Sequence, residues 1–221
     1  MTEQIYIDIR LKTNIIDEIH YFKIYYNIFL IINDKIIFEI QIFLFIFIHL
    51  ITNQLKINIM PFNFYAVLVS SLVTLLVGAI WYNPKVFGTI WMKETGMTEE
   101  KAQKSNMIKV FGLTIFYSFM LSFLMPVLVI HQFGALGMIG GPEFIATAKP
   151  SYAAFLADYG DAFRTFQHGA LHGFMTGLFF VLPITSINSL FEQKSWKYIL
   201  ITSGYWMVSL TIIGAIICGW K

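Results

Sequence analysis

The sequence predicts an all-α integral membrane protein: a four-helix bundle with a short interfacial helix in its first loop. Of its 221 residues, 57% are hydrophobic and only 13% are charged, whereas a soluble domain carries about 25% charged residues. Four apolar runs of about 20 residues follow residue 60, and each is nearly free of charge, which is typical of membrane-spanning helices. These runs are too long and too uniformly apolar for the alternating strands of a membrane barrel.

The composition of the chain changes near residue 60. Residues 1–59 contain 19 Ile and no Gly, Ala, Val or Pro, although the whole chain has 15 Gly and 6 Pro. We interpret residues 1–59 as a low-complexity Ile/Asn/Phe-rich extension, translated from A/T-rich DNA through a mis-called start, and we expect translation to begin at or near Met60. The alternative is a fifth membrane segment at Ile36–Leu50. That segment is short for a span and contains Glu39 and Gln41,.

Residues 60–221 form the expected membrane domain. Basic residues concentrate in the loop between the first two spans and in the short third loop, which carries Lys194 and Lys197. Because an excess of Lys and Arg marks the cytoplasmic side, we expect a multi-pass protein of the inner cell membrane with loops one and three in the cytoplasm and loop two outside. The expected spans are residues 62–80, 108–130, 168–187 and 198–219.

Loop one is expected to be structured. In "NPKVFGTIWMKETG", the apolar residues recur at helical spacing, and Gly96 stands where a short helix would end,. Aromatic residues near the ends of spans are typical of the membrane–water interface. We therefore assign as interfacial anchors Trp81, Tyr82, Pro84 and Trp91.

Two further helices are expected in the loops. Thr98 precedes two acidic residues and is predicted to cap a helix that runs on into the second span,. Ser151 is predicted to cap a short surface helix in "SYAAFLADYG" of loop two.

Small residues recur every four positions in the spans, which lets membrane helices approach closely. In the third span the repeat is Gly169, Gly173 and Gly177, and in the first span it ends at Gly78. We predict that these four glycines are helix-packing residues.

Three segments resemble a known family. They are "YAVLVSSLVTLLVGAIWYNPKVFGTIWMKETGMTEE", "HGALHGFMTGLFFVLPITSINSLFEQKS" and "GYWMVSLTIIGAII". The chain over about residues 60–220 resembles the domain of unknown function 1761, a family of small bacterial membrane proteins. The resemblance implies a four-span protein and implies no activity.

The best functional candidates are His172 and His168, in "HGALH". They lie one helical turn apart on one face, a spacing that suits a shared metal, but a site also needs a third ligand. Alternatively the imidazoles hydrogen-bond a hydroxyl, a carbonyl or water, and we prefer this interpretation. We therefore assign no catalytic residue, metal or cofactor, and rank His172 first because it lies deeper in the span. Possible third ligands in loop two are His131, Glu143, Asp158 and Asp161.

Three functional hypotheses remain open. The first is a non-enzymatic bundle that binds a lipid, a hydrophobic molecule or a protein partner. The second is a membrane enzyme or a metal or haem binder that uses His168 and His172, and the third is a small oligomeric transporter. The expected partners are the lipid bilayer and a second copy or another membrane protein. The net charge of +2 is too small to indicate nucleic acid,.

Overall fold

The computed structural model describes residue 42 and residues 62–221. The expected start at Met60, and the alternative span at Ile36–Leu50 apart from Ile42, therefore lie outside the described residues. Between residues 62 and 221 the chain forms helices and turns and contains no strand. The predicted all-α fold class is confirmed.

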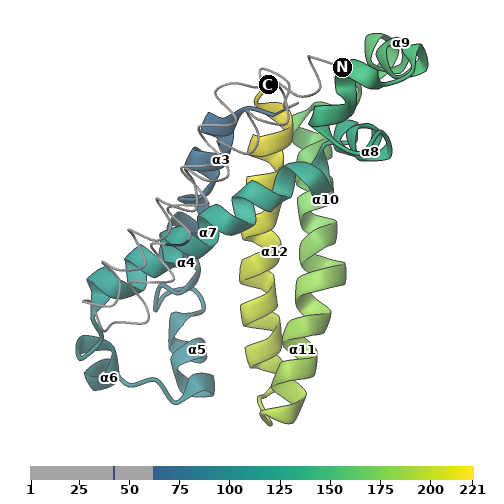
Figure 1. Ribbon diagram of the computed structural model, residues 1–221. Coiled ribbons are helices and arrows are strands. Elements are labelled where there is room, and N and C mark those ends of the chain that lie inside the picture. Colours follow the sequence, from purple (N-terminus) through teal and green to yellow (C-terminus); the bar gives the residue numbers. More distant parts are fainter. Residues whose placement is uncertain (1–41, 43–61) are drawn as a thin grey trace. The chain divides into compact units, whose positions relative to one another are not determined.

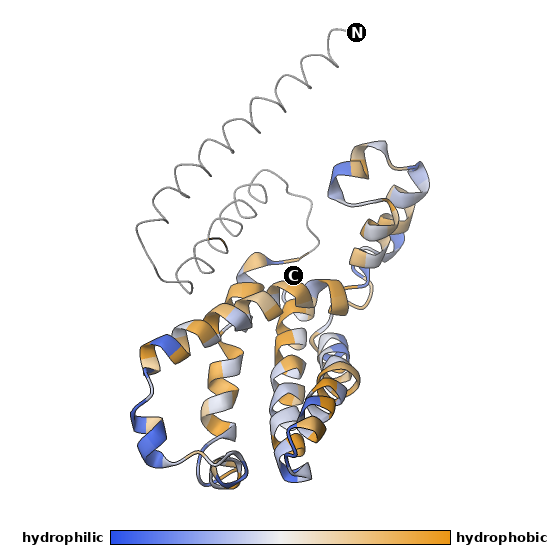
Figure 2. Cartoon of the chain, turned by 60° about the horizontal axis from the view of Figure 1, so that its bottom comes forward, coloured by the Kyte–Doolittle hydropathy of each residue, from blue (hydrophilic) through white to orange (hydrophobic). Residues whose placement is uncertain are grey.

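Among the described residues, four helical segments are long and apolar enough to cross a membrane, and Figure 2 colours much of their length orange, for hydrophobic residues. Their ends lie within four residues of the predicted ends. The largest difference is at the end of the third span, which is predicted at residue 187 and observed at residue 191. The first span consists of α3 (Phe64–Ser70) and α4 (Val73–Trp81), and the second is α7 (Met107–Val129). The third joins α10 (Phe166–Thr176), the π-helical turn η2 (Gly177–Val181) and α11 (Leu182–Phe191), and the fourth is α12 (Trp196–Gly219).

Helix α12 is the centre of the bundle, because it contacts each of the other three spans and packs most closely on α10 (Figure 1). A Cβ atom added to Gly169 would lie 2.1 Å from the carbonyl oxygen of Gly214, and one added to Gly173 would lie 2.0 Å from that of Leu210. At Gly177 the added atom would lie 2.7 Å from a Cα atom of α12. The two backbones are therefore in direct contact along this strip, which only glycine permits.

Hydrogen bonds link the first span both to the second span and to α12. The hydroxyl groups of Thr74 and Ser118 share a short hydrogen bond, and the Tyr205 hydroxyl donates to the Thr74 carbonyl at 2.9 Å. Gly78 lies against the Tyr205 ring, where an added Cβ atom would be 3.7 Å away. That is an ordinary contact distance, so Gly78 differs from the glycines of α10: a ring fills the space in front of it.

Loop one folds into α5 (Gly88–Thr95) and α6 (Glu99–Gln103). Gly96 ends α5 in the left-handed conformation at φ 67°, and Thr98 caps α6 by accepting the backbone N–H of Lys101 at 3.2 Å, as predicted. The prediction that α6 runs on into the second span is wrong. Asn106 interrupts the helix and caps α7 instead, accepting the N–H of Lys109 at 3.1 Å, because a short amide side chain competes with the backbone for such donors.

Two of the predicted anchors, Trp81 and Tyr82, contact α12. The Trp81 indole donates to the Ile201 carbonyl at 3.0 Å, and the Tyr82 ring lies 5.2 Å from the rings of both Trp91 and Tyr205. Burial raises the pKa of the Tyr82 phenol well above its usual value. Pro84 is exposed.

Loop two contains α8 (Gln132–Met138), the 3₁₀ turn η1 (Pro142–Thr147) and α9 (Pro150–Tyr159). The prediction that Ser151 caps the surface helix is wrong: α9 begins at Pro150, and Lys149 is at the cap position, two residues before the predicted cap, with no side-chain capping bond. Pro150 occupies the first helical position, which suits proline because its fixed φ is helical and it has no N–H to satisfy.

Candidate metal centre

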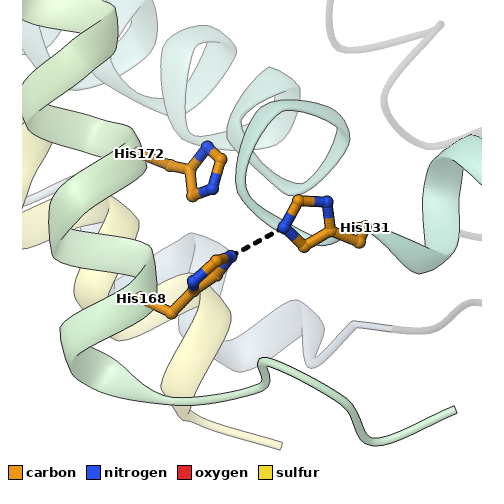
Figure 3. A group of neighbouring side chains, drawn as sticks. All are labelled: His131, His168 and His172. Carbon is orange, nitrogen blue, oxygen red and sulfur yellow. Dashed lines mark hydrogen bonds between the residues drawn. The ribbon is translucent and has the colours of Figure 1, made fainter. Parts of the chain in front are cut away.

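Three histidines from two parts of the chain meet at the loop-two end of the bundle (Figure 3). His168 and His172 lie one turn apart near the start of α10, and His131 lies immediately before α8. The Thr165 side chain accepts the backbone N–H of His168 at 3.2 Å. This cap sets where α10 begins, and the four-residue spacing of the two histidines places them on one face of the helix.

The three imidazoles are close enough to share one ion. His131 Nε2 and His168 Nε2 lie 2.8 Å apart, within hydrogen-bond distance. The ring of His172 lies 4.5 Å from that of His168 and 5.1 Å from that of His131. One ligand nitrogen from each residue lies within 4.8 Å of the other two. His168 and His172 are half-buried and His131 is exposed, so the cluster can be reached from solvent.

Side-chain hydrogen bonds hold the two halves of the cluster together. The Gln132 side chain, only 5% exposed, donates to the Tyr159 carbonyl at 2.7 Å and to the Ala162 carbonyl at 3.1 Å. Since Gln132 follows His131 directly, these bonds tie the start of α8 to the segment that leads into α10. The position of His131 beside α10 therefore depends on a buried amide.

The segment before α10 is also attached to the end of α12. Arg164 Nε donates to the Cys218 carbonyl at 3.0 Å, and the Cys218 thiol lies 3.4 Å from the Phe163 carbonyl. Burial lowers the pKa of the Arg164 guanidinium, although the nearby Asp161 opposes this. Phe163 has a left-handed backbone at φ 61°, a strained conformation for a bulky residue. Its ring lies 5.2 Å from that of His168.

Of the four possible third ligands in loop two, the structure brings only His131 to the pair. Glu143, Asp158 and Asp161 are not in the cluster, and Asp161 instead pairs with Lys221 at 3.0 Å. One sequence signal pointed to His131: it directly follows the second span, so it lies at the same end of the bundle as the start of the third span. The bond network around Gln132 had no recognisable sequence pattern.

An all-imidazole cluster has a restricted chemistry. Imidazole nitrogen suits zinc, copper, nickel and iron, whereas calcium and magnesium require oxygen ligands. Three protein ligands also leave one position of a tetrahedral ion open to water or another ligand. The residues present are therefore compatible with a transition-metal ion.

The four apolar helices of residues 62–221 that are long enough to cross a membrane define the chain as a multi-pass helical membrane protein. The family model described as "Protein of unknown function (DUF1761)" matches residues 65–218, and the chain belongs to this family. The resemblance inferred from the sequence is thus confirmed. Comparisons with curated proteins and with solved structures found no match.

Proposed function

We propose that this protein binds a divalent transition-metal ion at its loop-two end, through His131, His168 and His172. The single observation that carries the proposal is the convergence of three imidazoles from two separate segments, with one ligand nitrogen each within 4.8 Å of the others. Two histidines one turn apart are a permissive pattern. The third, contributed by a distant segment, makes a metal site the better interpretation than three independent hydrogen-bonded side chains.

The distances support an ion of the size of Zn²⁺. With Zn–N bonds of about 2.0–2.1 Å, two nitrogens on a tetrahedral ion lie about 3.3 Å apart. The separations here range from 2.8 Å for the closest pair to at most 4.8 Å, and they bracket this value. Small side-chain rotations would therefore suffice. A haem is less compatible, because two nitrogens at 2.8 Å leave no space for a macrocycle between them.

The proposal does not include a reaction. In "HGALH" a glycine follows the first histidine where the zinc metalloprotease pattern carries its catalytic glutamate,. An open fourth position is consistent with capture or exchange of the ion and does not by itself imply hydrolysis. We therefore propose a non-enzymatic metal-binding membrane protein.

We further propose that the metal centre faces outward. The motivation is the lysine-rich composition of loops one and three, which marks the cytoplasmic side, whereas the histidine cluster lies at the opposite end. Reporter fusions test this orientation: a phosphatase fused near Ala153 should be active, and one fused near Lys93 or Lys194 should be inactive. The reverse pattern would contradict it.

Metal titration tests the proposed function. The purified protein should bind one Zn²⁺ per chain, and Co²⁺ should give the absorption of a tetrahedral site. Replacing any one of the three histidines with alanine should weaken binding by at least tenfold, because two remaining ligands hold the ion poorly. We expect the largest loss for His172→Ala, since His172 lies deeper in the span and has less access to a replacement water ligand.

Two acidic residues of loop two provide matched controls. Glu143→Gln and Asp161→Asn alter side chains outside the cluster and should leave Zn²⁺ affinity unchanged. If the three histidine variants bind Zn²⁺ as tightly as the parent protein does, the proposed function is wrong.

A further inference from the structure

A cavity of about 630 Å³ lies beside the histidine cluster and is lined by residues of α8, η1 and α9. Gly140 and Gly141 follow α8 with φ values of 98° and 123°, a conformation that favours glycine, and the chain turns there so that α9 packs against α8 (Figure 1). The volume is within the range of small-molecule sites, about 300–1,000 Å³. His131 lines the cavity and also belongs to the cluster, so one side chain joins the two sites.

The lining of the cavity is largely apolar and carries one positive charge. Ala135, Met138 and Phe155 contribute apolar side chains, and Lys149 contributes an ammonium group. Among the described residues, no carboxylate lines the cavity and none forms an ion pair with Lys149. Ligand pockets commonly combine an apolar lining with a few polar groups that orient the ligand. This lining therefore suits a ligand with one negative charge and an apolar body.

The His131 ring offers such a ligand a hydrogen-bond donor. Its Nε2 atom lies 2.8 Å from His168 Nε2, so Nε2 is the nitrogen placed to bind the proposed metal ion. The ring proton is then on Nδ1, which points away from His168 (Figure 3). A metal-bound histidine almost always donates this second N–H to a carboxylate, a backbone carbonyl or water. A carboxylate held in the cavity by Lys149 can fill that role.

We propose that the cavity binds a small amphipathic carboxylate, which accepts the Nδ1–H of His131 and pairs with Lys149. The inference rests on the proposed function, because the bound ion is what fixes the proton of His131 on Nδ1. One lysine and one neutral N–H balance a single negative charge, which favours a carboxylate over a doubly charged phosphate. The apolar body of the ligand lies against Met138 and Phe155.

This arrangement couples the two ligands. A carboxylate that accepts from a metal-bound imidazole makes that imidazole a stronger metal ligand, and the loss of such a partner typically lowers metal affinity 10–100-fold. Coupling between two binding sites is reciprocal, so the ion must strengthen binding of the carboxylate by the same factor. The carboxylate therefore acts as a co-ligand that controls how tightly the protein holds its metal ion.

Zn²⁺ titration with and without octanoate tests the inference. Octanoate should raise the Zn²⁺ affinity of the purified protein by about tenfold. Octanol, which has the apolar chain without the charge, should have no effect. Acetate, which has the charge without the chain, should have a much smaller effect at equal concentration.

Lysine variants locate the site. Lys149→Ala should remove the octanoate effect and leave the Zn²⁺ affinity without octanoate unchanged, because Lys149 is outside the histidine cluster. Lys149→Arg keeps the charge and should retain the effect. Lys221→Ala is the matched control: Lys221 pairs with Asp161 of loop two at 3.0 Å and does not line the cavity, so the octanoate effect should persist.

Binding of labelled octanoate separates this inference from the proposed function. The metal-free protein should bind octanoate about tenfold more weakly than the Zn²⁺-loaded protein does. Zn²⁺ binding that octanoate does not change would contradict this inference alone. An absence of Zn²⁺ binding would contradict the proposed function, and octanoate binding to the metal-free protein would then decide the cavity: binding that Lys149→Ala removes supports it, and no binding contradicts it.

Three further results would overturn the inference. Equal effects of octanol and octanoate would mean that the chain acts through the detergent micelle. Equal effects of acetate and octanoate would mean that the apolar lining has no role. A change in the Co²⁺ absorption bands as large as that caused by a new metal ligand would place the carboxylate on the ion itself and not on His131 Nδ1.

Discussion

Helix α12 packs against its neighbours in two different ways. Toward α10 it uses close backbone contact, with Gly169 and Gly173 against Gly214 and Leu210. Toward the first span it uses a hydrogen bond from a side chain: the Tyr205 hydroxyl bonds the Thr74 carbonyl, and the Thr74 hydroxyl in turn bonds Ser118 of the second span. The first contact depends on shape alone, and the second on hydrogen bonds between groups that lipid cannot satisfy.

The difference shows that some helix contacts in a membrane bundle are rigid, whereas others tolerate substitution. Since lipid is as apolar as the side chains, no hydrophobic force draws these helices together, and packing and hydrogen bonds must do so. Where two backbones are in contact, an added side chain forces the helices apart, and the whole contact area is lost. A hydroxyl contact loses one bond, and water or a nearby carbonyl can replace part of it. We therefore expect substitutions in the glycine strip to be more damaging than those among the hydroxyls.

The largest effect is expected for Gly173→Leu. A Cβ atom there would lie 2.0 Å from the Leu210 carbonyl oxygen, so α10 and α12 must separate, at an expected cost of about 3 kcal/mol or more. Detergent unfolding measures the loss. Because His168 and His172 are on α10, Zn²⁺ affinity should fall as well.

Leu171→Ala is the control for this substitution. Leu171 is on the same helix but is 55% exposed, so its side chain makes little contact with the rest of the bundle. Its loss should change stability by less than about 0.5 kcal/mol. Equal and small effects of the two substitutions would mean that the glycine strip faces lipid and that the close contact with α12 is wrong.

A smaller effect is expected for Thr74→Val. Valine keeps the shape of threonine and removes the hydroxyl that bonds Ser118, while the Thr74 carbonyl still accepts the Tyr205 hydroxyl. Hydrogen bonds between membrane helices contribute about 0.6 kcal/mol on average and at most about 1.7, so the loss should lie in that range. A double-mutant cycle with Ser118→Ala should give a coupling energy of similar size, and a coupling of zero would contradict the bond.

The sequence predicts the spans well and the contacts between distant segments poorly. A run of about 20 apolar residues must cross the membrane as a helix, because lipid offers the backbone no other partner. The position of His131, in contrast, depends on where the Gln132 amide finds carbonyl acceptors 27 and 30 residues away. No local pattern encodes such a pairing, so the sequence left four possible third ligands for the histidine pair.

The loop helices show the same limit at short range. Ser151 and Thr98 both look like helix caps in the sequence, yet only Thr98 acts as one. The difference is Pro150, which takes the first helical position, so that α9 starts two residues earlier than it would with Ser151 as its cap. Ser151 therefore lies inside the first turn and is not at the cap position. The neighbouring proline was the sequence feature that indicated this.

The smallest effect is expected for Gly78→Ala, and it sharpens the comparison most directly. Gly78 belongs to a four-residue repeat of small residues in the first span, of the same kind as the glycine repeat of α10, but an added Cβ atom would lie 3.7 Å from the Tyr205 ring, at ordinary contact distance. Alanine also favours the helix over glycine by about 1 kcal/mol in water. Stability in detergent should therefore stay within about 0.5 kcal/mol of the parent protein or rise slightly, whereas Gly173→Ala, with the same added methyl group, should be clearly destabilising. Similar losses at both positions would show that the first span approaches α12 as closely as α10 does, and the distinction between a backbone contact and a side-chain contact would then fail.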